Sequence, residues 1–297
     1  MTLLALLLAL IVERVATRLL HLREAHWLDG YAAWARTRLA GRSGPAGGAL
    51  CAAVALVPAL PVALVAGWLA QGAPTIVWLA FASLVLVFSL GPRDLGDEVD
   101  DYVDRELAGD EEGARRAAAE IIEHDAAQRR GARADSVEDA IFVQANNRVF
   151  GVVFWFVALG PTGLGPAAAW LFRVSDLMRR SDISAHQGVA DGHGCAERVH
   201  FALAWLPARL LALGYAFAGS FEDARQGWRA RYAELPAQLL ERNDWLLVHV
   251  GRAALGPLPP PGPGVPLPPR AAMRLASRAL VIWLVVVAVL SLTAWIA

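Results

Sequence analysis

The sequence predicts an all-α, polytopic membrane protein: a helical bundle with a cytoplasmic helical section, a broken or re-entrant central helix pair and a single C-terminal span. Residues 48–70, 75–91 and 279–297 carry no charged side chain, and each run is close to the roughly 20 apolar residues that a membrane-crossing helix needs. Hydrophobic residues make up 56% of the 297 and charged residues 19%, whereas soluble domains carry about 25% charge. Run length and composition together define this fold class.

The N-terminal section, residues 1–91, is expected to hold the first membrane helices. A helix over 2–20 would carry Glu13 and Arg14, which place polar groups on an otherwise apolar surface. The two charge-free runs that follow are joined by the short turn 71–74, so we expect them to form an antiparallel hairpin. The N-terminus lacks a basic start and a small-residue cleavage site, which predicts an uncleaved membrane segment rather than a signal peptide.

Residues 92–147 form a large polar section that is predicted to be helical and cytoplasmic. Two amphipathic helices are expected in it, with Asp110 as the N-cap of the second. Arginine supplies all 27 basic side chains apart from histidine; it is abundant here and in 220–278 and absent from the turn 71–74. The positive-inside rule therefore places this section in the cytoplasm of a bacterial inner membrane protein, where it is available to a cytoplasmic protein partner.

The section 148–255 is predicted to contain the broken membrane hairpin, followed by amphipathic helices. Its apolar stretch is interrupted by Gly160–Pro166, and each half is too short to cross a bilayer alone. A proline-rich linker at 256–269 is expected to be semi-rigid. It leads to the C-terminal transmembrane helix, 270–297.

Several kinds of chemistry are excluded or weakly supported. The two cysteines cannot form a disulfide framework, and the net charge of −1 gives no attraction to nucleic acid. No glycine-rich phosphate loop or serine elbow is present. The acidic run 94–104 is typical of a solvated helix face, and the His/Cys/Glu segment 186–200 matches no standard zinc spacing. No metal site is expected.

Polar residues that enter the apolar layer are the main functional candidates. Arg173 and Asp176 follow the broken hairpin and lie one helical turn apart, so they form either a simple ion pair or part of a site. Pro207 and Arg209 interrupt a later apolar run, which predicts a helix packed on the bundle or lying in the interface.

A family resemblance runs along most of the chain. The start, with Glu13-Arg14 and His26-Trp-Leu-Asp29, resembles the AmpE family, inner-membrane proteins of β-lactamase induction whose gene accompanies a muropeptide-recycling amidase. The resemblance continues in order through Asn146, Arg148, Phe154-Trp155, Phe172-Arg173 and Trp205-Leu-Pro207-Ala-Arg209. It implies a regulatory membrane protein rather than an enzyme.

AmpE proteins are in turn similar to the adenosylcobinamide-phosphate synthases (CobD/CbiB), membrane enzymes that form an amide with ATP and Mg²⁺. The sequence resembles them in Leu107-Ala-Gly-Asp110 with Arg115, and in His124-Asp125. Where that family has Ser-Glu-Asn-x-x-Asp-Gly, this chain reads Phe-Val-Gln-Ala-Asn-Asn-Arg over 142–148 and lacks both carboxylates. The resemblance therefore implies a shared fold and argues against synthase activity.

Two functional hypotheses follow. The first is an inner-membrane regulatory or sensory protein without a cofactor, which responds to a small anionic or cell-wall-derived ligand. Its role would be in the antibiotic response, through β-lactamase induction and muropeptide stress signalling. The second is a membrane-embedded, amide-forming ligase that uses Mg and ATP on a changed substrate. A transporter-like role and a purely structural polar network also stay open. Candidate ligand-binding or polar-network residues are Glu13, Arg14, Asp110, Arg115, Asp125, Asn146, Asn147, Arg148, Arg173, Asp176 and Arg209; under the second hypothesis Asp110, Arg115 and Asp125 bind ATP, and Arg148 and Arg173 the anionic substrate.

Overall fold

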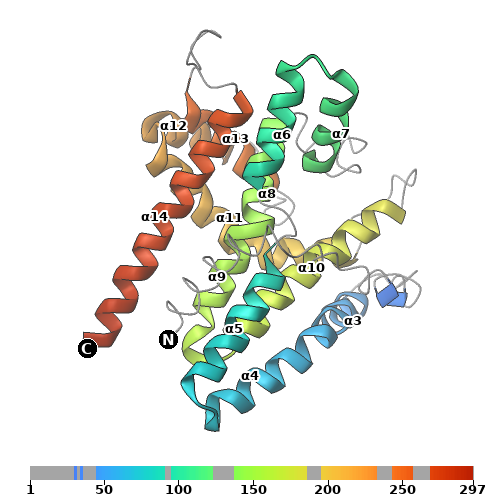
Figure 1. Ribbon diagram of the computed structural model, residues 1–297, viewed down its shortest axis with the longest axis vertical. Coiled ribbons are helices and arrows are strands. Elements are labelled where there is room, and N and C mark those ends of the chain that lie inside the picture. Colours follow the sequence, from blue (N-terminus) through green and yellow to red (C-terminus); the bar gives the residue numbers. More distant parts are fainter. Residues whose placement is uncertain are drawn as a thin grey trace. The chain divides into compact units, whose positions relative to one another are not determined.

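Helices make up every described element of the structure, which is a computed structural model (Figure 1). It describes residues 30–31, 34–35, 45–90, 95–122, 137–185, 195–232, 243–256 and 268–296. No strand occurs among these residues, so the all-α prediction is confirmed. The chain divides into two compact units, one of residues 1–92 with 147–204 and one of residues 93–146 with 205–297.

Four described helices are long and apolar enough to cross a membrane. They are Ala52–Gly72, Val137–Ala158, Ala196–Ala218 and Pro268–Ser291. The predicted membrane fold is therefore confirmed, although the spans are not all those that the sequence predicts. The second charge-free run forms the shorter helix α5 (Thr75–Ser89) of 15 residues, and the run with Pro207 and Arg209 qualifies by length and composition.

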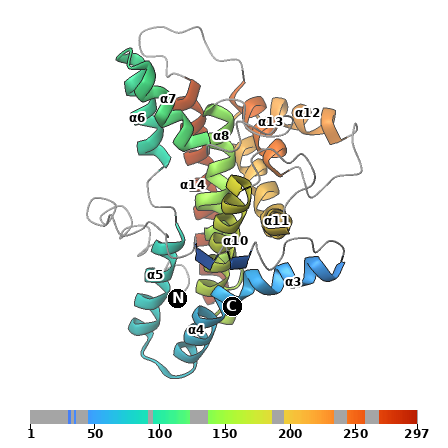
Figure 2. The same ribbon diagram turned by 90° about the vertical axis from the view of Figure 1, so that its right-hand side faces the viewer.

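The first unit is built around one long helix, α10 (Gly165–Ala185), which packs against every other helix of the unit for which contacts are described. These neighbours are α3 (Pro45–Leu56), α4 (Leu60–Gly72), α5 and α9 (Gly151–Ala158). A 3₁₀ turn, η2 (Val57–Ala59), separates α3 from α4. The α4 and α5 helices form the predicted antiparallel hairpin (Figure 2). Trp170 on α10 donates its indole N–H to the Pro58 carbonyl at 3.1 Å, which ties the two parts of this unit together.

Glycines allow α9 and α10 to pack closely. They are joined by the 3₁₀ turn η5 (Gly160–Thr162) and by Gly163, whose φ of 78° lies in the left-handed region that favours glycine. A Cβ on Gly151 would lie 2.2 Å from the Phe172 ring, and one on Gly165 would lie 2.4 Å from the Phe156 carbonyl oxygen. The interruption that the sequence predicts at Gly160–Pro166 is thus a tight helix–helix turn.

The re-entrant arrangement predicted for this hairpin is not confirmed. The apolar stretch before the turn continues from α8 (Val137–Gln144) through a π-helical segment, η4 (Ala145–Phe150), into α9. The resulting helix, Val137–Ala158, has 22 residues, enough to cross a bilayer. The sequence predicts a boundary at 148 and therefore leaves out the first half of this helix.

The second unit packs α13 (Asn243–Leu255) and α14 (Pro268–Ile296) against α8. The hydroxyl of Tyr215, in the C-terminal part of α11 (Cys195–Ala218), donates to the Phe142 carbonyl at 2.9 Å. A Cβ on Gly251 would lie 2.7 Å from the Phe142 ring. Phe142 and Tyr215 are fully buried and form the aromatic centre of this unit.

An acidic helical hairpin, α6 (Leu95–Leu107) and α7 (Glu111–Ile122), belongs to the second unit, in which α7 packs on α8 (Figure 1). Both helices begin with acidic residues and α6 ends with Arg105, the arrangement that the helix dipole favours. Arg270, at the start of α14, donates to Asp100 at 2.8 Å and to Asp104 at 2.6 Å. The remaining helix of this unit, α12 (Phe221–Tyr232), packs on α13.

Candidate functional site

A buried group of charged side chains lies on the polar half of α10. The Asp176 carboxylate is fully buried. It accepts from Arg173 Nη1 at 3.2 Å, Arg179 Nη2 at 2.7 Å and Arg180 Nε at 2.9 Å. Residues three and four apart share a face of an α-helix, so the sequence spacing alone brings these groups together. We name Arg173, Asp176, Arg179 and Arg180 the Asp176 cluster.

Burial makes this cluster energetically unlike a surface ion pair. Arg173 and Arg179 are both buried, and the Arg180 side chain is about a quarter exposed, at 24%. Hydrogen bonds between guanidinium and carboxylate are the strong, charge-assisted kind. Removing one partner of a buried charge pair leaves the other uncompensated, which costs several kcal/mol, about 3–5. Asp176 therefore holds three arginines in place.

A chain of polar contacts links the cluster to α11. Ser175 donates its hydroxyl to the Phe172 carbonyl at 2.7 Å, and Ser175 Oγ lies 3.0 Å from His200 Nδ1. His200 Nε2 lies 3.4 Å from Asn147 Oδ1 and 3.9 Å from Asp176 Oδ1. Because the Ser175 hydroxyl proton goes to the carbonyl, His200 Nδ1–H donates to Ser175. All four of these polar side chains are buried.

The Ser175–His200 contact does not form a hydrolytic pair. A serine nucleophile gives its proton to histidine, whereas the Ser175 proton is engaged by a backbone carbonyl. The histidine also packs on the Phe172 ring, with centroids 5.1 Å apart. These contacts hold the start of α11 against α10, which fixes the groups around Asp176.

The Asp176 cluster is chemically suited to an anion. It contains three guanidinium groups and one carboxylate, and guanidinium forks match carboxylate and phosphate oxygens in pairs. His200 and Asn147 add polar groups to the same face of the site. Glu197, one turn before His200 on α11, is a second buried carboxylate of the unit.

The π-helical segment η4 carries three of the sequence-predicted residues, Asn146, Asn147 and Arg148. All three are buried. Asn147 Oδ1 lies 3.4 Å from His200 Nε2, which in turn lies 3.9 Å from Asp176 Oδ1. Short π-helical segments inside α-helices occur frequently at functional sites, and this one turns Asn147 toward the cluster.

Arg209 forms a separate site in the second unit. Its Nη1 donates to the Trp205 carbonyl at 2.8 Å and to Asn243 Oδ1 at 2.9 Å. The guanidinium also lies over the Trp205 ring, 4.1 Å from its centroid, a cation–π contact. These contacts satisfy Arg209 locally between α11 and α13. The predicted residues Glu13, Arg14 and Asp125 lie outside the described residues.

Asp110 and Arg115 lie on the α6–α7 hairpin. Asp110 Oδ1 accepts from the Gly113 backbone N–H at 2.9 Å, which confirms its predicted role as an N-cap. Arg115 lines a cavity of about 280 Å³ together with Tyr102, Glu106, Gly109, Glu111, Ala114 and Ala118. Asp110 does not line it.

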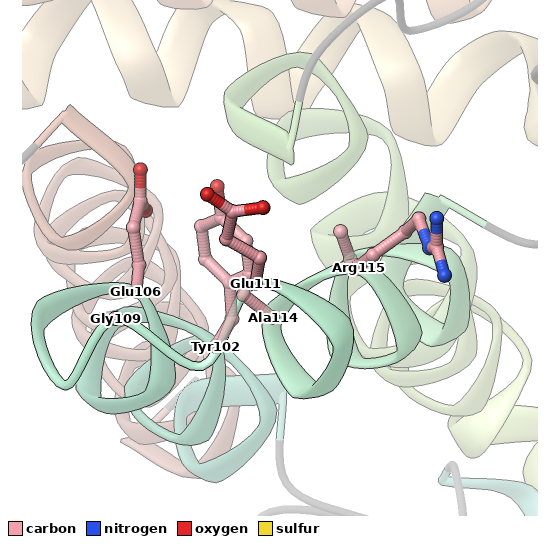
Figure 3. Close-up of a pocket in the computed structure, with 7 residues that line it drawn as sticks. Tyr102, Glu106, Gly109, Glu111, Ala114 and Arg115 are labelled. Carbon is pink, nitrogen blue, oxygen red and sulfur yellow. The ribbon is translucent and has the colours of Figure 1, made fainter.

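This cavity is a poor nucleotide site as it stands. Glu106 and Glu111 point into the space above Tyr102, whereas the Arg115 side chain extends away from it (Figure 3). Burial raises the pKa of the Tyr102 phenol to about 12, with further contributions from its hydrogen bond to Glu106 and from the charges of Glu106 and Glu138. The local field is thus negative and opposes phosphate groups. Among the described residues no group of three or more His, Cys, Asp or Glu side chains is placed to hold a metal ion.

Sequence reasoning missed part of the Asp176 cluster. Arg179 and Arg180 follow Asp176 at the helical spacings of three and four, a local signal that was available. Ser175 and His200 are 25 residues apart, and the sequence around His200 suggests only a metal ligand. No local pattern indicates that contact, because it depends on how α11 packs on α10.

The described helices and the buried arginine-rich site define an all-α membrane protein. The chain belongs to the AmpE family: the model of this family, described as "Regulatory signalling modulator protein AmpE", matches residues 1–296. It is therefore a membrane protein of a regulatory family.

A curated relative, the cobalamin biosynthesis protein CobD of Stutzerimonas stutzeri, is 30% identical over 174 residues, which are 58% of this chain and 55% of CobD. The chain thus spans about half the length of the curated relative that it matches. This match agrees with the sequence resemblance to the CobD/CbiB enzymes. No solved structure matches the chain.

Proposed function

We propose that this chain is a multi-pass regulatory protein of the bacterial inner membrane that acts in β-lactamase induction. In this role the Asp176 cluster binds a small anionic ligand derived from the cell wall, such as a muropeptide. Ligand binding is the signal, and no reaction is catalysed. The proposal extends the regulatory family membership to a named site and a class of ligand.

One observation carries the proposal: three guanidinium groups converge on a single buried carboxylate. Muropeptides carry carboxylates, which guanidinium groups bind with paired hydrogen bonds. A buried site strengthens this interaction because the surrounding dielectric is low. Asp176 is the internal competitor, since it occupies the same guanidinium groups that an incoming carboxylate would bind.

Binding is tested on the purified protein in a non-ionic detergent. The probes are a purified muropeptide and the same muropeptide with its carboxyl groups amidated. The acidic form is expected to raise Tm, with stabilisation of about 2.7 kcal/mol at a concentration of 100 Kd; the amidated form is expected to leave Tm unchanged. Arg179→Gln should remove the effect, whereas the control Arg225→Gln, on the exposed surface of α12, should retain it. Equal responses to both probes would contradict an anion site.

The cellular role is tested in a deletion strain. Loss of the protein is expected to change β-lactamase induction and the muropeptide pool, and the wild-type gene is expected to restore both. Arg179→Gln at normal abundance should fail to restore them, while Arg225→Gln should succeed. Unchanged induction and unchanged pools in the deletion strain would overturn the regulatory proposal.

A Mg- and ATP-dependent ligase is the second candidate, favoured by the CobD match. Against it stand the missing carboxylates at 142–148 and the acidic cavity beside Arg115. ATP with Mg²⁺ would raise Tm of the purified protein if this activity were present. We expect no such rise, and a rise abolished by Arg115→Gln would favour the ligase.

A further inference from the structure

The cavity between α6 and α7 is a second candidate site, separate from the anion site of the proposed function. Small residues create it: Gly109, Ala114 and Ala118 leave space beside the Tyr102 ring. Gly109 has a φ of 74°, so its left-handed conformation turns the chain between the two helices. We name this cavity the Tyr102 pocket. Its volume of about 280 Å³ lies just below the range of small-molecule pockets and suits a single side chain.

Two carboxylates from different helices face the pocket. Glu106 comes from the end of α6 and Glu111 from the start of α7, and both line the pocket together with Tyr102 (Figure 3). Tyr102 hydrogen-bonds to Glu106 and is also close enough to Glu138 for that charge to raise the phenol pKa. The phenol therefore stays neutral at physiological pH, while the carboxylates around it are negative.

The pocket carboxylates differ from their neighbours in the way they are paired. On the same hairpin Asp101 pairs with Arg105, Glu112 with Arg116, and both Asp100 and Asp104 with Arg270. Neither Glu106 nor Glu111 forms an ion pair with any arginine in the described parts of the chain. The hairpin as a whole, residues 95–122, has ten acidic and three basic residues, a net charge of −7. Both carboxylates that line the pocket thus lack an arginine partner, whereas Asp100, Asp101, Asp104 and Glu112 have one.

We propose that the Tyr102 pocket receives an arginine side chain from a basic segment of a partner protein. The planar guanidinium group would stack on the Tyr102 ring and donate to Glu106 and Glu111. The apolar stem would lie against Ala114 and Ala118, as long basic side chains do on apolar surfaces. The remaining negative charge of the hairpin would steer the basic segment toward the pocket.

The test measures peptide binding to the full-length protein in non-ionic detergent by fluorescence anisotropy. The probe is a fluorescein-labelled hexapeptide with two arginines, and the control probe carries citrulline, a neutral analogue of similar shape, at both positions. The arginine peptide is expected to bind and the citrulline peptide to bind at least about tenfold more weakly, a difference of about 1.4 kcal/mol. Equal binding of the two probes, or no binding of either, would overturn the proposal.

Two double variants separate the pocket from the general charge of the hairpin. Glu106→Gln/Glu111→Gln should weaken the arginine peptide by about tenfold or more. Glu112→Gln/Glu120→Gln removes the same charge from the same hairpin outside the pocket and should leave binding within about twofold. Similar losses in both variants would show that binding is only long-range attraction, which contradicts the proposal.

A third variant tests the cavity without changing any charge. Ala118→Leu adds apolar volume to the lining of the pocket and is expected to abolish the preference for arginine over citrulline. Retained preference in this variant would place the arginine elsewhere. The muropeptide response of the first unit should be unchanged in all three variants, so failure of this inference is distinguishable from failure of the proposed function.

Discussion

The Asp176 cluster and the α6–α7 hairpin use the same residue types with opposite balance and opposite burial. In the cluster three arginines surround one buried carboxylate; on the hairpin ten acidic residues outnumber three arginines and most are exposed. Exposed ion pairs contribute little to stability, whereas breaking a buried one is costly. The comparison shows that burial, rather than the presence of charge, decides which region depends on its ion pairs for stability.

Removing the Asp176 carboxylate should have the largest effect on stability. Asp176→Ala leaves three guanidinium groups together on one face of α10, and we expect a loss of about 3–5 kcal/mol in the free energy of unfolding. Thermal unfolding in detergent measures it. Acetate at high concentration should partly restore Tm in this variant and not in the wild type, because it can take the place of the missing carboxylate.

Glu222→Gln is the matched control for that experiment. Glu222 pairs with Arg225 through the same helical spacing of three, but both side chains are exposed. The expected loss is at most about 0.5 kcal/mol. Similar Tm changes in the Asp176 and Glu222 variants would break the distinction between buried and exposed charge.

Removing the polar contact between Ser175 on α10 and His200 on α11 should have an intermediate effect on stability. Ser175→Ala removes the partner of His200 Nδ1 and leaves that buried imidazole unsatisfied. We expect a loss of about 1–3 kcal/mol, measured by thermal unfolding. His200→Ala/Ser175→Ala should lose less than the sum of the single variants, since both remove one interaction. Additive losses would contradict a direct Ser175–His200 contact.

The contact of Arg270 with Asp100 and Asp104 should contribute least. Although it joins α14 to α6, both acidic side chains are well exposed, so Arg270→Gln should cost less than about 1 kcal/mol. Its small contribution should fall further at high salt, because screening acts on exposed charges. A large, salt-independent loss would mean that this contact behaves as a buried one.

The Tyr102 pocket predicts a spectroscopic signature at high pH. The absorbance titration of the wild type minus that of Tyr102→Phe should show one phenol ionising near pH 12 rather than 10. Because the folded-state pKa is raised, this group's contribution to stability is fully present below pH 10 and is lost as pH rises through 12. Glu106→Gln should shift the ionisation to lower pH, since it removes a negative charge beside the phenol.

The sequence predicted the class of the fold and one half of the site. The charge-free runs 48–70 and 279–297 predicted two of the membrane helices, and the N-cap at Asp110 was predicted correctly, because these signals are local. The extent of Val137–Ala158 was missed because its first turns contain Glu138 and Asp139, which obscure an apolar helix. Arg173 and Asp176 were found by their spacing. The contact with His200 depends on tertiary packing, and the pocket beside Tyr102 depends on the turn that brings α7 back along α6.

The most direct test of the central claim is to titrate each of three purified proteins with two probes of opposite charge. The muropeptide and the arginine hexapeptide are titrated against wild type, Arg179→Gln and Glu106→Gln/Glu111→Gln, with Kd measured for each pair. We predict that Arg179→Gln weakens only the muropeptide and that the glutamate variant weakens only the peptide, each by about tenfold or more. If either variant weakened the binding of both probes, or of neither probe, the result would contradict two separate sites of opposite charge.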